Sequence, residues 1–391
     1  VLVAAQTALA LILLAGAGLM LQSVRNLRNV SPGFDSTGVL TAVVNLPHAR
    51  YKSFEQVDAF YHELLARASV IPGVQAVGAG ADIPLNGFGG CAAVWREDHP
   101  LQPGEEPPCV GASTAAPGYF HALGIKVRGQ EPSWSDMERL SGGVVVTRAL
   151  AERLWPGKDA MGKGIRGNVD GPPYYHVVGV TDDIRGVALD QPPVETVFFP
   201  MLPTAELWSP PTTMTLILKS RGVAPEALTG SLRHLLRGMD PNVPLAKVQT
   251  MDAVAAKSMR RLSFTMMLLG IAATMALILS AVGIYGVISY IVGRRTGEIG
   301  IRMALGARAS RVGRLIVWQS LRLTGIGVVI GILGALAMTR VLRSVLFDVS
   351  PTDPFTLASV SAVMLIIAGL ASYVPAQRAM RVEPAEALRA E

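Results

Sequence analysis

Four long runs without a charged residue constrain this chain more than any other feature. A helix that crosses the hydrocarbon core of a bilayer needs about 20 mostly apolar residues. It also pairs all of its own backbone polar groups, which lipid cannot do. The uncharged runs cover residues 1–24, 262–293, 323–339 and 354–377. With residues 316–321 added to the short third run, they predict four transmembrane helices, at 1–24, 262–293, 316–339 and 354–377.

The first run allows a second interpretation. A secretory signal peptide is also apolar, but it begins with basic residues and ends at a small-residue cleavage site. Neither feature stands out in this sequence, which favours a transmembrane helix. The chain begins with Val1, inside the run, rather than with Met. We therefore interpret the sequence as a fragment, or as half of a longer protein.

The distribution of charge orients these helices. Half of the 391 residues are hydrophobic, only 16% are charged, and the formal net charge is +6. Residues 25–262 hold equal numbers of basic and acidic residues, so the excess lies in the C-terminal part. Residues 294–322 carry seven arginines and one acid, Glu298. Basic residues between two apolar runs are typical of a cytoplasmic loop, and we expect no nucleic-acid partner.

The resulting topology places one large domain outside the membrane. The arginine-rich residues 294–315 lie inside, and so does the tail at 378–391, because two spans separate them. Residues 25–261 and the short link at 340–353 then lie outside. The fold class that we expect is an α-helical membrane protein: four transmembrane helices, with a large α/β domain inserted between the first and the second.

The second run is longer than a bilayer requires. Its 32 residues would form a helix of about 48 Å, whereas the hydrocarbon core is about 30 Å thick. Either this helix projects from the membrane as a stalk of the outside domain, or one end of the run is a loop.

Small residues recur within the spans. Gly327 and Gly331 have the GxxxG spacing, and Ala276 and Ser280 are spaced alike. Such residues let helices approach closely in lipid, although Gly and Ala are also simply common in spans. None of the four runs contains a charge, which argues against ion-coupled transport.

The outside region alternates strand-like and helix-like segments. Ser53 and Gln56 have the spacing of a capping box at the start of one helix. The pattern predicts two α/β units that flank a β-rich insert. The segments are a strand, a helix and a strand at 38–46, 53–69 and 73–85; a strand, a helix and a strand at 214–220, 225–237 and 244–251; and, between them, a strand and helix at 141–155 and a strand at 174–184.

Cys91 and Cys109 are the only cysteines, and both fall in the outside region. That compartment is oxidising. A disulfide between them would stabilise the fold by about 3 kcal/mol on the chain-entropy estimate. Two free thiols are the alternative.

Two motif-like stretches lack residues that their chemistry requires. "PGKDAMGKG" (156–164) begins like a P-loop, but Gly164 replaces the Ser or Thr that would hold magnesium. We interpret it as a glycine-rich turn between a helix and a strand. "HELLA" (62–66) begins like a zinc-protease helix, but Ala66 replaces the second His. We expect no metal, no cofactor and no catalytic site.

The stretch "RRTGEIGIRMALGA" (294–307) directly follows the second run on the cytoplasmic side. If it is helical, Glu298 and Arg302 pair at i, i+4. The apolar pairs beside them are Ile299 with Met303 and Ile301 with Leu305. An amphipathic segment joined to a membrane helix suits docking into a partner's groove. An interfacial helix that lies on anionic lipid fits the periodicity equally well.

This stretch resembles the signature of MacB-type and FtsX-type ABC transporter permeases. The resemblance covers nearly the whole chain and keeps its blocks in order. The start of the chain is similar to the second half of a duplicated permease, as in an orphan subgroup without a fused ATPase. The other similar blocks are "APGYFHALGIKVRGQ" (116–130), "VVVTRALAERLWPGKDAMGKGIR" (144–166), "YYHVVGVTDDIRG" (174–186) and "VPAQRAMRVEPAEALR" (374–389).

The resemblance implies a mechanical function in the bacterial inner membrane. Permeases of this kind form dimers, and cytoplasmic ATPase subunits dock on a coupling helix, here about residues 296–307. ATP-driven closure of the ATPases would shift the second span and the periplasmic domain for efflux or export. The contact residues implied are Glu298, Ile299, Gly300, Ile301, Arg302, Ala304, Leu305, Gly306 and Ala307.

Other functions and partners also stay open at this point. An FtsX-like scaffold that regulates a periplasmic enzyme is the main alternative, and a membrane-bound enzyme is a third. Besides the ATPase, the expected partners are a second permease copy or homologous half, membrane lipid, and a periplasmic adaptor or substrate protein.

Overall fold

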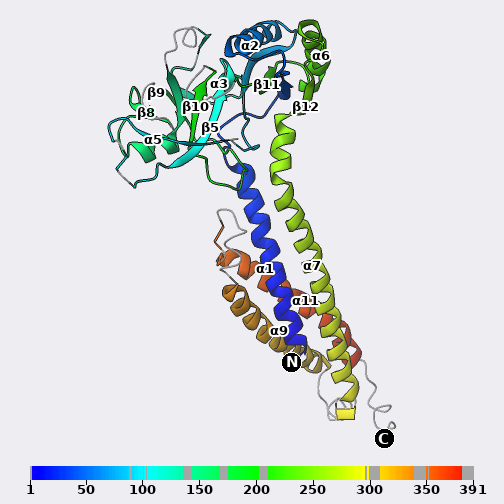
Figure 1. Cartoon of the computed structure of the whole chain (residues 1–391). Coiled ribbons are helices and arrows are strands. Elements are labelled where there is room, and N and C mark those ends of the chain that lie inside the picture. The colour runs from blue at the N-terminus through cyan, green and yellow to red at the C-terminus, as the bar shows by residue number, and fades with distance from the viewer. Residues whose placement is uncertain are drawn as a thin grey trace. The chain divides into compact units, whose positions relative to one another are not determined.

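The computed structural model describes residues 2–87, 90–99, 101–102, 104–131, 133–134, 142–167, 175–201, 210–295, 297–298, 309–338, 349–350 and 352–380. The chain divides into two compact units (Figure 1). The membrane unit consists of Val1–Asn29 with Arg261–Glu391, and the α/β unit consists of Val30–Arg260.

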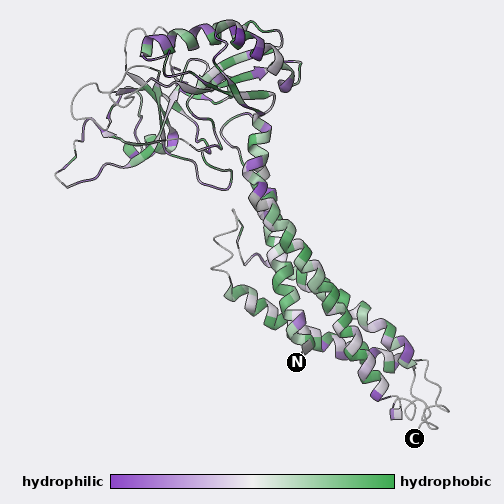
Figure 2. Cartoon of the chain, turned by 45° about the vertical axis from the view of Figure 1, so that its right-hand side comes forward, coloured by the Kyte–Doolittle hydropathy of each residue, from purple (hydrophilic) through white to green (hydrophobic). Residues whose placement is uncertain are grey.

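Four long helices make up the described part of the membrane unit. They are α1 (Leu2–Asn29), α7 (Met251–Arg294), α9 (Ala309–Ala337) and α11 (Pro354–Met380). All four are long and apolar enough to cross a membrane, and Figure 2 shows hydrophobic residues along most of their length. The expected four transmembrane helices, one of them at the N-terminus, are therefore present.

The helices extend beyond the uncharged runs that predicted them. The first continues past Arg25 to Asn29, and the last continues past Arg378 to Met380. The third begins at Ala309, inside the segment expected to be a cytoplasmic loop at 294–315. Arginine is a good helix former and its long side chain can carry its charge away from an apolar surface. A charged residue therefore ends an apolar run without ending the helix.

The second run is helical from end to end, so the alternative of a loop within residues 262–293 is wrong. Helix α7 begins at Met251 and has 44 residues. Its first turns, up to Arg260, belong to the α/β unit, and the rest belongs to the membrane unit. One helix is therefore shared by both units.

Glycines on α9 bring its backbone close to α1. A Cβ atom added at Gly327 would lie 2.7 Å from the Cβ of Thr7 and 2.9 Å from the carbonyl oxygen of Ala4. At Gly331 it would lie 3.0 Å from the Cβ of Leu11. Any larger residue at these positions would push the two helices apart. Lipid supplies no hydrophobic drive for helix association, so this close contact contributes directly to bundle stability.

One 12-stranded mixed sheet runs through the described residues of the α/β unit, in the order β12-β1-β11-β2-β5-β10-β7-β9-β8-β4, with β3 on β5 and β6 on β9. The strands are β1 (Val39–Asn45), β2 (Val74–Gly80), β3 (Gly90–Ala93), β4 (Trp95–Arg96), β5 (Cys109–Ala115), β6 (Val127–Gly129), β7 (Gly143–Thr147), β8 (Gly164–Arg166), β9 (Tyr175–Thr181), β10 (Thr196–Pro200), β11 (Thr213–Ser220) and β12 (Leu245–Thr250). The helices are α2 (Phe54–Ser69), α3 (Tyr119–Ala122), α5 (Arg148–Leu154), the 3-10 turn η1 (Pro225–Ala227) and α6 (Leu228–Met239).

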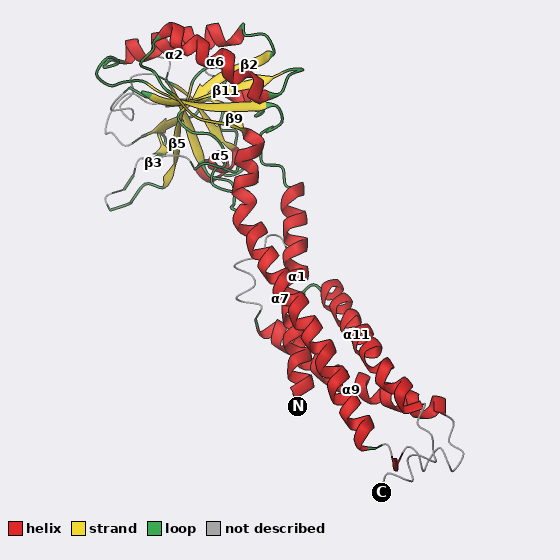
Figure 3. Ribbon diagram, turned by 90° about the vertical axis from the view of Figure 1, so that its right-hand side faces the viewer, coloured by secondary structure: helices red, strands yellow, loops and turns green. Residues whose placement is uncertain are grey.

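The two predicted strand–helix–strand segments interleave in a single lobe. Strand β11 lies between β1 and β2 and is antiparallel to both, and β12 pairs with the outer edge of β1. Helices α2 and α6 cover one face of these strands (Figure 3). This order is that of a split βαβ fold, and we call it the split βαβ lobe. The capping box predicted at Ser53 and Gln56 is confirmed.

Alternating residues of the strands build the core of this lobe. Leu40, Ala42 and Val44 point from β1 into a cluster that also contains Leu216 and Leu218 of β11. Helix α6 adds Leu228, Leu232 and Leu236 at one-turn spacing. Burying one leucine side chain contributes roughly 1.5–3 kcal/mol, so this contact holds the helix against the sheet.

Residues 81–201, where described, form a second lobe, which we call the insert lobe. Its core contains Trp155 and Tyr175 together with valines of β7 and β9. The strand and helix predicted at 141–155 and the strand at 174–184 are present as β7, α5 and β9. Strands β3, β4, β5, β6, β8 and β10 were not predicted. Several are only two to four residues long, too short for an alternating pattern, and every residue of β10 is buried.

A buried carboxylate fixes the end of α6 to the start of α2. The side chain of Asp240 is 1% exposed and accepts hydrogen bonds from the Arg50 guanidinium (2.9 Å) and the Tyr51 hydroxyl (3.0 Å). It also accepts one from the backbone N–H of Asn242 (2.9 Å). This backbone bond is the largest of the causes that lower the pKa of Asp240. Folding therefore favours the ionised carboxylate.

We expect Asp240→Asn to lower the stability of the α/β unit at neutral pH. The loss should be about 1–3 kcal/mol, the usual cost of weakening hydrogen bonds to a charged buried group. Because the folded pKa lies below the unfolded value near 3.8, the wild-type advantage is present above that pH and disappears as the pH falls through the folded pKa. Thermal melts of the purified chain across pH measure the difference. Asp190→Asn, at an exposed position, is the control, and an equal loss in both variants would contradict the assignment.

We expect Gly327→Val to destabilise the helix bundle by about 1–3 kcal/mol, as overpacking does. Its Cβ would enter the space held by Thr7. Gly325→Val is the matched control, because it lies on the same helix and a Cβ there has nothing within 4 Å. Denaturant titration in detergent, followed by the helical circular dichroism signal, measures both variants. Equal stability of the two would show that the glycine contact with α1 contributes nothing.

Candidate functional site

The predicted coupling residues follow α7. Glu298 is exposed on the surface of the chain. Ile299, Gly300, Ile301, Arg302, Ala304, Leu305, Gly306 and Ala307 lie outside the described residues. Their assignment as ATPase contacts thus stays a prediction.

The predicted helix-packing residues have defined surroundings in the membrane unit. Gly327 and Gly331 face α1, as described above. Ala276 of α7 packs on a cluster that includes Leu11 of α1. Ser280, one turn further along α7, is 1% exposed. Ala276 and Ser280 therefore lie on the side of α7 that faces the other helices.

A disulfide joins Cys91 of β3 to Cys109 of β5. The two strands are antiparallel neighbours, and the Cα atoms of the cysteines lie 5.4 Å apart. The cross-link closes the loop between these strands at one edge of the insert lobe. It lies in the region whose compartment the sequence predicts to be oxidising.

The stretch that resembles a P-loop is a turn between α5 and β8. Gly157 and Gly162 adopt positive φ angles of 65° and 73°, which favour glycine. Asp159 forms an ion pair with Arg128 (2.6 Å), and the Lys163 ammonium lies 5.3 Å from the centre of the Trp155 ring. A helix precedes the turn where a P-loop has a strand. The interpretation as a glycine-rich turn is confirmed.

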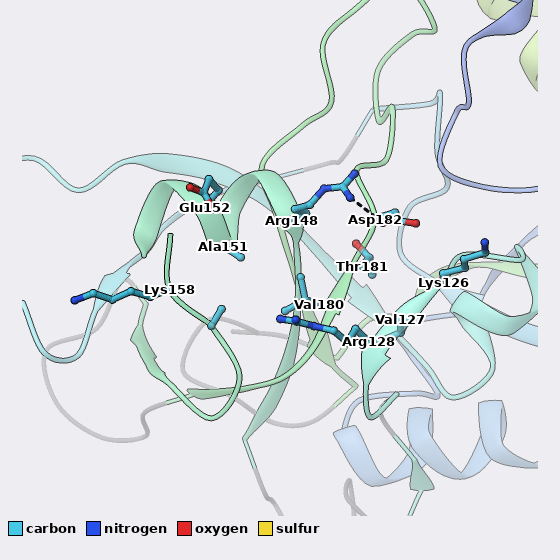
Figure 4. A pocket seen from close by; sticks show the side chains of 11 residues that line it. Lys126, Val127, Arg128, Arg148, Ala151, Glu152, Lys158, Val180, Thr181 and Asp182 are labelled. Carbon is cyan, nitrogen blue, oxygen red and sulfur yellow. Dashed lines mark hydrogen bonds and ion pairs between the residues drawn. The ribbon is translucent and has the colours of Figure 1, made fainter. Parts of the chain in front are cut away.

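A pocket of about 390 Å³ lies between α5, β6 and the end of β9 (Figure 4). Its buried floor consists of Ala151, Ala160, Val180 and Thr181. The Thr181 hydroxyl has no hydrogen-bond partner among the residues that the structure describes. Four basic side chains and two acidic ones also line the pocket: Lys126, Arg128, Arg148, Lys158, Glu152 and Asp182. No group of three or more potential metal ligands occurs in the described ranges.

Arg148 and two aspartates form an ion-pair cluster at the edge of this pocket. The Arg148 guanidinium lies 3.1 Å from a carboxylate oxygen of Asp182 and 3.3 Å from a carboxylate oxygen of Asp183. Asp183 also accepts a hydrogen bond from the backbone N–H of Ala149 at the start of α5 (2.8 Å). This cluster fastens the segment after β9 to α5.

The sequence analysis missed this cluster, although a signal for it was present. Strands β7 and β9 are parallel, with Thr147 paired with Thr181. Residues that follow two adjacent parallel strands emerge at the same edge of the sheet. The strings "VVVTR" and "VGVTDD" place an arginine and two aspartates at those positions. Recognising β7 and β9 as parallel neighbours would have predicted the ion pairs.

Two family descriptions match the chain in sequence. "MacB-like periplasmic core domain" matches residues 3–235, and "FtsX-like permease C-terminal" matches residues 270–384. The first match covers more than half of the chain and includes the α/β unit up to α6. The second covers most of α7 and all of α9 and α11.

Curated relatives are export proteins that are much longer than this chain. The pyoverdine export ATP-binding/permease protein PvdT of Pseudomonas savastanoi pv. phaseolicola is 31% identical over 43% of this chain and 25% of its own length. The probable syringafactin export ATP-binding/permease protein SyfD of Pseudomonas syringae pv. tomato is 30% identical over 69% of this chain and 40% of its own length. The chain thus spans between a quarter and two fifths of these relatives.

A solved structure is also similar to the chain. It is the periplasmic region of MacB from Actinobacillus actinomycetemcomitans, which is 15% identical and aligns with a TM-score of 0.38 over 60% of this chain and 97% of its own length.

The order of elements agrees with both family matches. An apolar helix at the N-terminus, a mixed α/β unit and three further apolar helices follow one another along the chain. The chain therefore belongs to the MacB- and FtsX-like ABC transporter permeases, which are multi-pass proteins of the bacterial inner membrane.

Proposed function

We propose that the chain is the permease subunit of an ABC transporter of the mechanotransmission type. A separate cytoplasmic ATPase binds at about residues 296–307, and its ATP-driven closure shifts α7 and, with it, the α/β unit. The movement drives efflux or export on the periplasmic side. The substrate does not need to pass between the helices.

The observation that carries this proposal is the continuity of α7. Its 44 residues extend over about 66 Å at 1.5 Å per residue, more than twice a hydrocarbon core of about 30 Å. Its first turns are part of the α/β unit, and it ends at Arg294, four positions before Glu298. An unbroken helix carries displacement from one end to the other.

The charge of the cytoplasmic segment supports the location of the ATPase site. The seven arginines of residues 294–322 retain this segment on the inner side of the membrane, where ATP is available. The relatives PvdT and SyfD are named as ATP-binding and permease proteins in one chain. An ATP-binding part accompanies the permease in these relatives, and we propose that an ATPase subunit does so here.

Helix α7 offers a surface for the expected dimer. Phe264, Met267, Ile271, Met275 and Ile278 are large apolar residues that α7 leaves exposed. In the membrane these side chains face either lipid or the helices of a second permease copy or homologous half. A periplasmic adaptor or substrate protein would complete the assembly.

Charge reversal at Glu298 tests the ATPase site. We expect Glu298→Arg to reduce co-purification of the partner ATPase about tenfold, which corresponds to 1.4 kcal/mol of binding free energy. Gly306→Trp should do the same by steric exclusion. Glu226→Arg, an exposed site in the α/β unit, is the control. Full retention of the ATPase by both test variants would refute the site. An ATPase rate that rises with exported compound favours export over an FtsX-like scaffold.

A further inference from the structure

The split βαβ lobe, and not the insert lobe, continues directly into the two segments that lead to the membrane helices. Residues 30–38, which we call the entry segment, follow α1 and lead into β1. The first turns of α7, Met251–Arg260, follow β12. Strands β1 and β12 are paired neighbours in the split βαβ lobe. The insert lobe lies between β2 and β11 in sequence, so any movement of these two segments must reach it through other contacts.

The segment after β9 supplies such contacts on the entry side. We call residues 182–194 the strap. The backbone N–H of Arg185 donates a hydrogen bond to the carbonyl oxygen of Pro32 (3.1 Å). At Gly33, φ is +84°, and an added Cβ would lie 2.2 Å from the carbonyl oxygen of Asp183. The strap therefore rests directly on the entry segment, at a position where only glycine fits.

The same strap also contacts α7. The backbone N–H of Leu189 donates a hydrogen bond to the Ser258 hydroxyl (3.1 Å). Ser258 lies in the part of α7 that belongs to the α/β unit. The side chain of Leu189 is buried, so this hydrogen bond is made by a well-packed residue. Two points four residues apart on the strap thus hold two segments that lead to different membrane helices.

The strap is firmly fixed to the body of the insert lobe. Asp183 accepts the hydrogen bond from Ala149 of α5, and Arg148 of α5 pairs with Asp182 and Asp183. Beyond the strap, the carbonyl oxygen of Glu195 accepts a hydrogen bond from the N–H of Gly111 in β5 (2.8 Å). A displacement of the strap is therefore delivered to α5 and to the central strands of the insert lobe.

The two lobes meet at a short joint in the sheet, beside which α3 packs on β2: an added Cβ at Gly78 would lie 2.4 Å from the carbonyl oxygen of Gly118. Strands β2 and β5 form a single ladder pair, Gly80 with Ala115, whereas β1 and β11 form seven. A pocket of about 410 Å³ separates part of the entry segment from Arg148 and Asp182. The sheet is therefore weakest between β2 and β5, and there is space beside the strap.

We propose that the strap couples the insert lobe to both membrane-leading segments. The Ser36 hydroxyl donates a hydrogen bond to Asp252 of α7 (2.6 Å), so the two segments move together, and their displacement turns the insert lobe about the Gly80–Ala115 joint. The inference deepens the proposed function and rests on it, since a permease driven by an ATPase supplies the shift. Ser258, Gly33 and Asp183 are the positioning residues of this coupling.

Hydrogen exchange on the full chain in lipid nanodiscs, without any ATPase, tests the strap. In Ser258→Ala, amide exchange should become roughly threefold to tenfold faster, the effect of losing one hydrogen bond of ordinary net strength. In Gly33→Ala it should rise at least as much, because the new Cβ would clash with the carbonyl oxygen of Asp183. The faster exchange should extend from the strap to Ala149 in α5 and leave α2 and α6 unchanged. Ser231→Ala at an exposed site and Gly222→Ala, where φ is +73° and no atom lies within 4 Å, are the matched controls. Both should leave exchange in the strap and in α5 as in wild type.

Distances between the lobes give a second readout. Spin labels at Lys158→Cys and His234→Cys, both exposed positions, report the insert lobe against α6. We expect a broader distance distribution in Gly33→Ala than in Gly222→Ala. Three results would refute the coupling role of the strap. They are faster exchange that stops at the substituted segment, equally faster exchange in α2 and α6, and an unchanged distance distribution. Because no ATPase is present, none of these outcomes bears on Glu298, and loss of the ATPase site would leave these results standing.

Discussion

An unbroken ladder of backbone hydrogen bonds along α7 is the constraint on which the rest of the structure depends. In lipid an unpaired peptide group is costly, so a spanning segment has to remain helical. Helix α7 keeps that ladder from Met251 to Arg294, although only residues 262–293 are free of charge. The continuation into the α/β unit is therefore not imposed by the membrane. Because of this continuation, the first turns of α7 are a structural part of the α/β unit, which is stabilised by burial of apolar residues from water.

The two units are stabilised by different forces. The α/β unit expels water from between its helices and sheet, and residues such as Leu232 and Trp155 become almost completely buried. In the membrane unit, transfer from lipid to a helix interface gains little, and close packing has to replace it. Gly327 and Gly331 serve that purpose against α1. A bundle held mainly by close packing can exchange one packed arrangement for another at modest cost, which suits a protein whose helices have to move.

Sequence patterns predicted the features that depend on local chemistry. Uncharged runs located all four membrane helices, and the Ser53–Gln56 spacing located the start of α2. The helix ends were missed because arginines such as Arg25 and Arg378 are helix formers as well as charges. The interleaving of the two α/β segments was missed because strand order depends on contacts between residues far apart in the chain. Similarly, the Arg148 cluster requires the knowledge that β7 and β9 are parallel neighbours.

The pairing of the sheet is weakest between β2 and β5. Each ladder hydrogen bond contributes about 1 kcal/mol net, so distorting the seven-pair ladder between β1 and β11 costs several times more than distorting the single pair at Gly80 and Ala115. The strap connects the lobes by contacts outside the sheet. Asp183 packs against Gly33, and the N–H of Leu189 donates a hydrogen bond to the Ser258 hydroxyl. The presence of the strap beside a short joint is consistent with two lobes that move relative to each other while both remain attached to the segments entering the membrane.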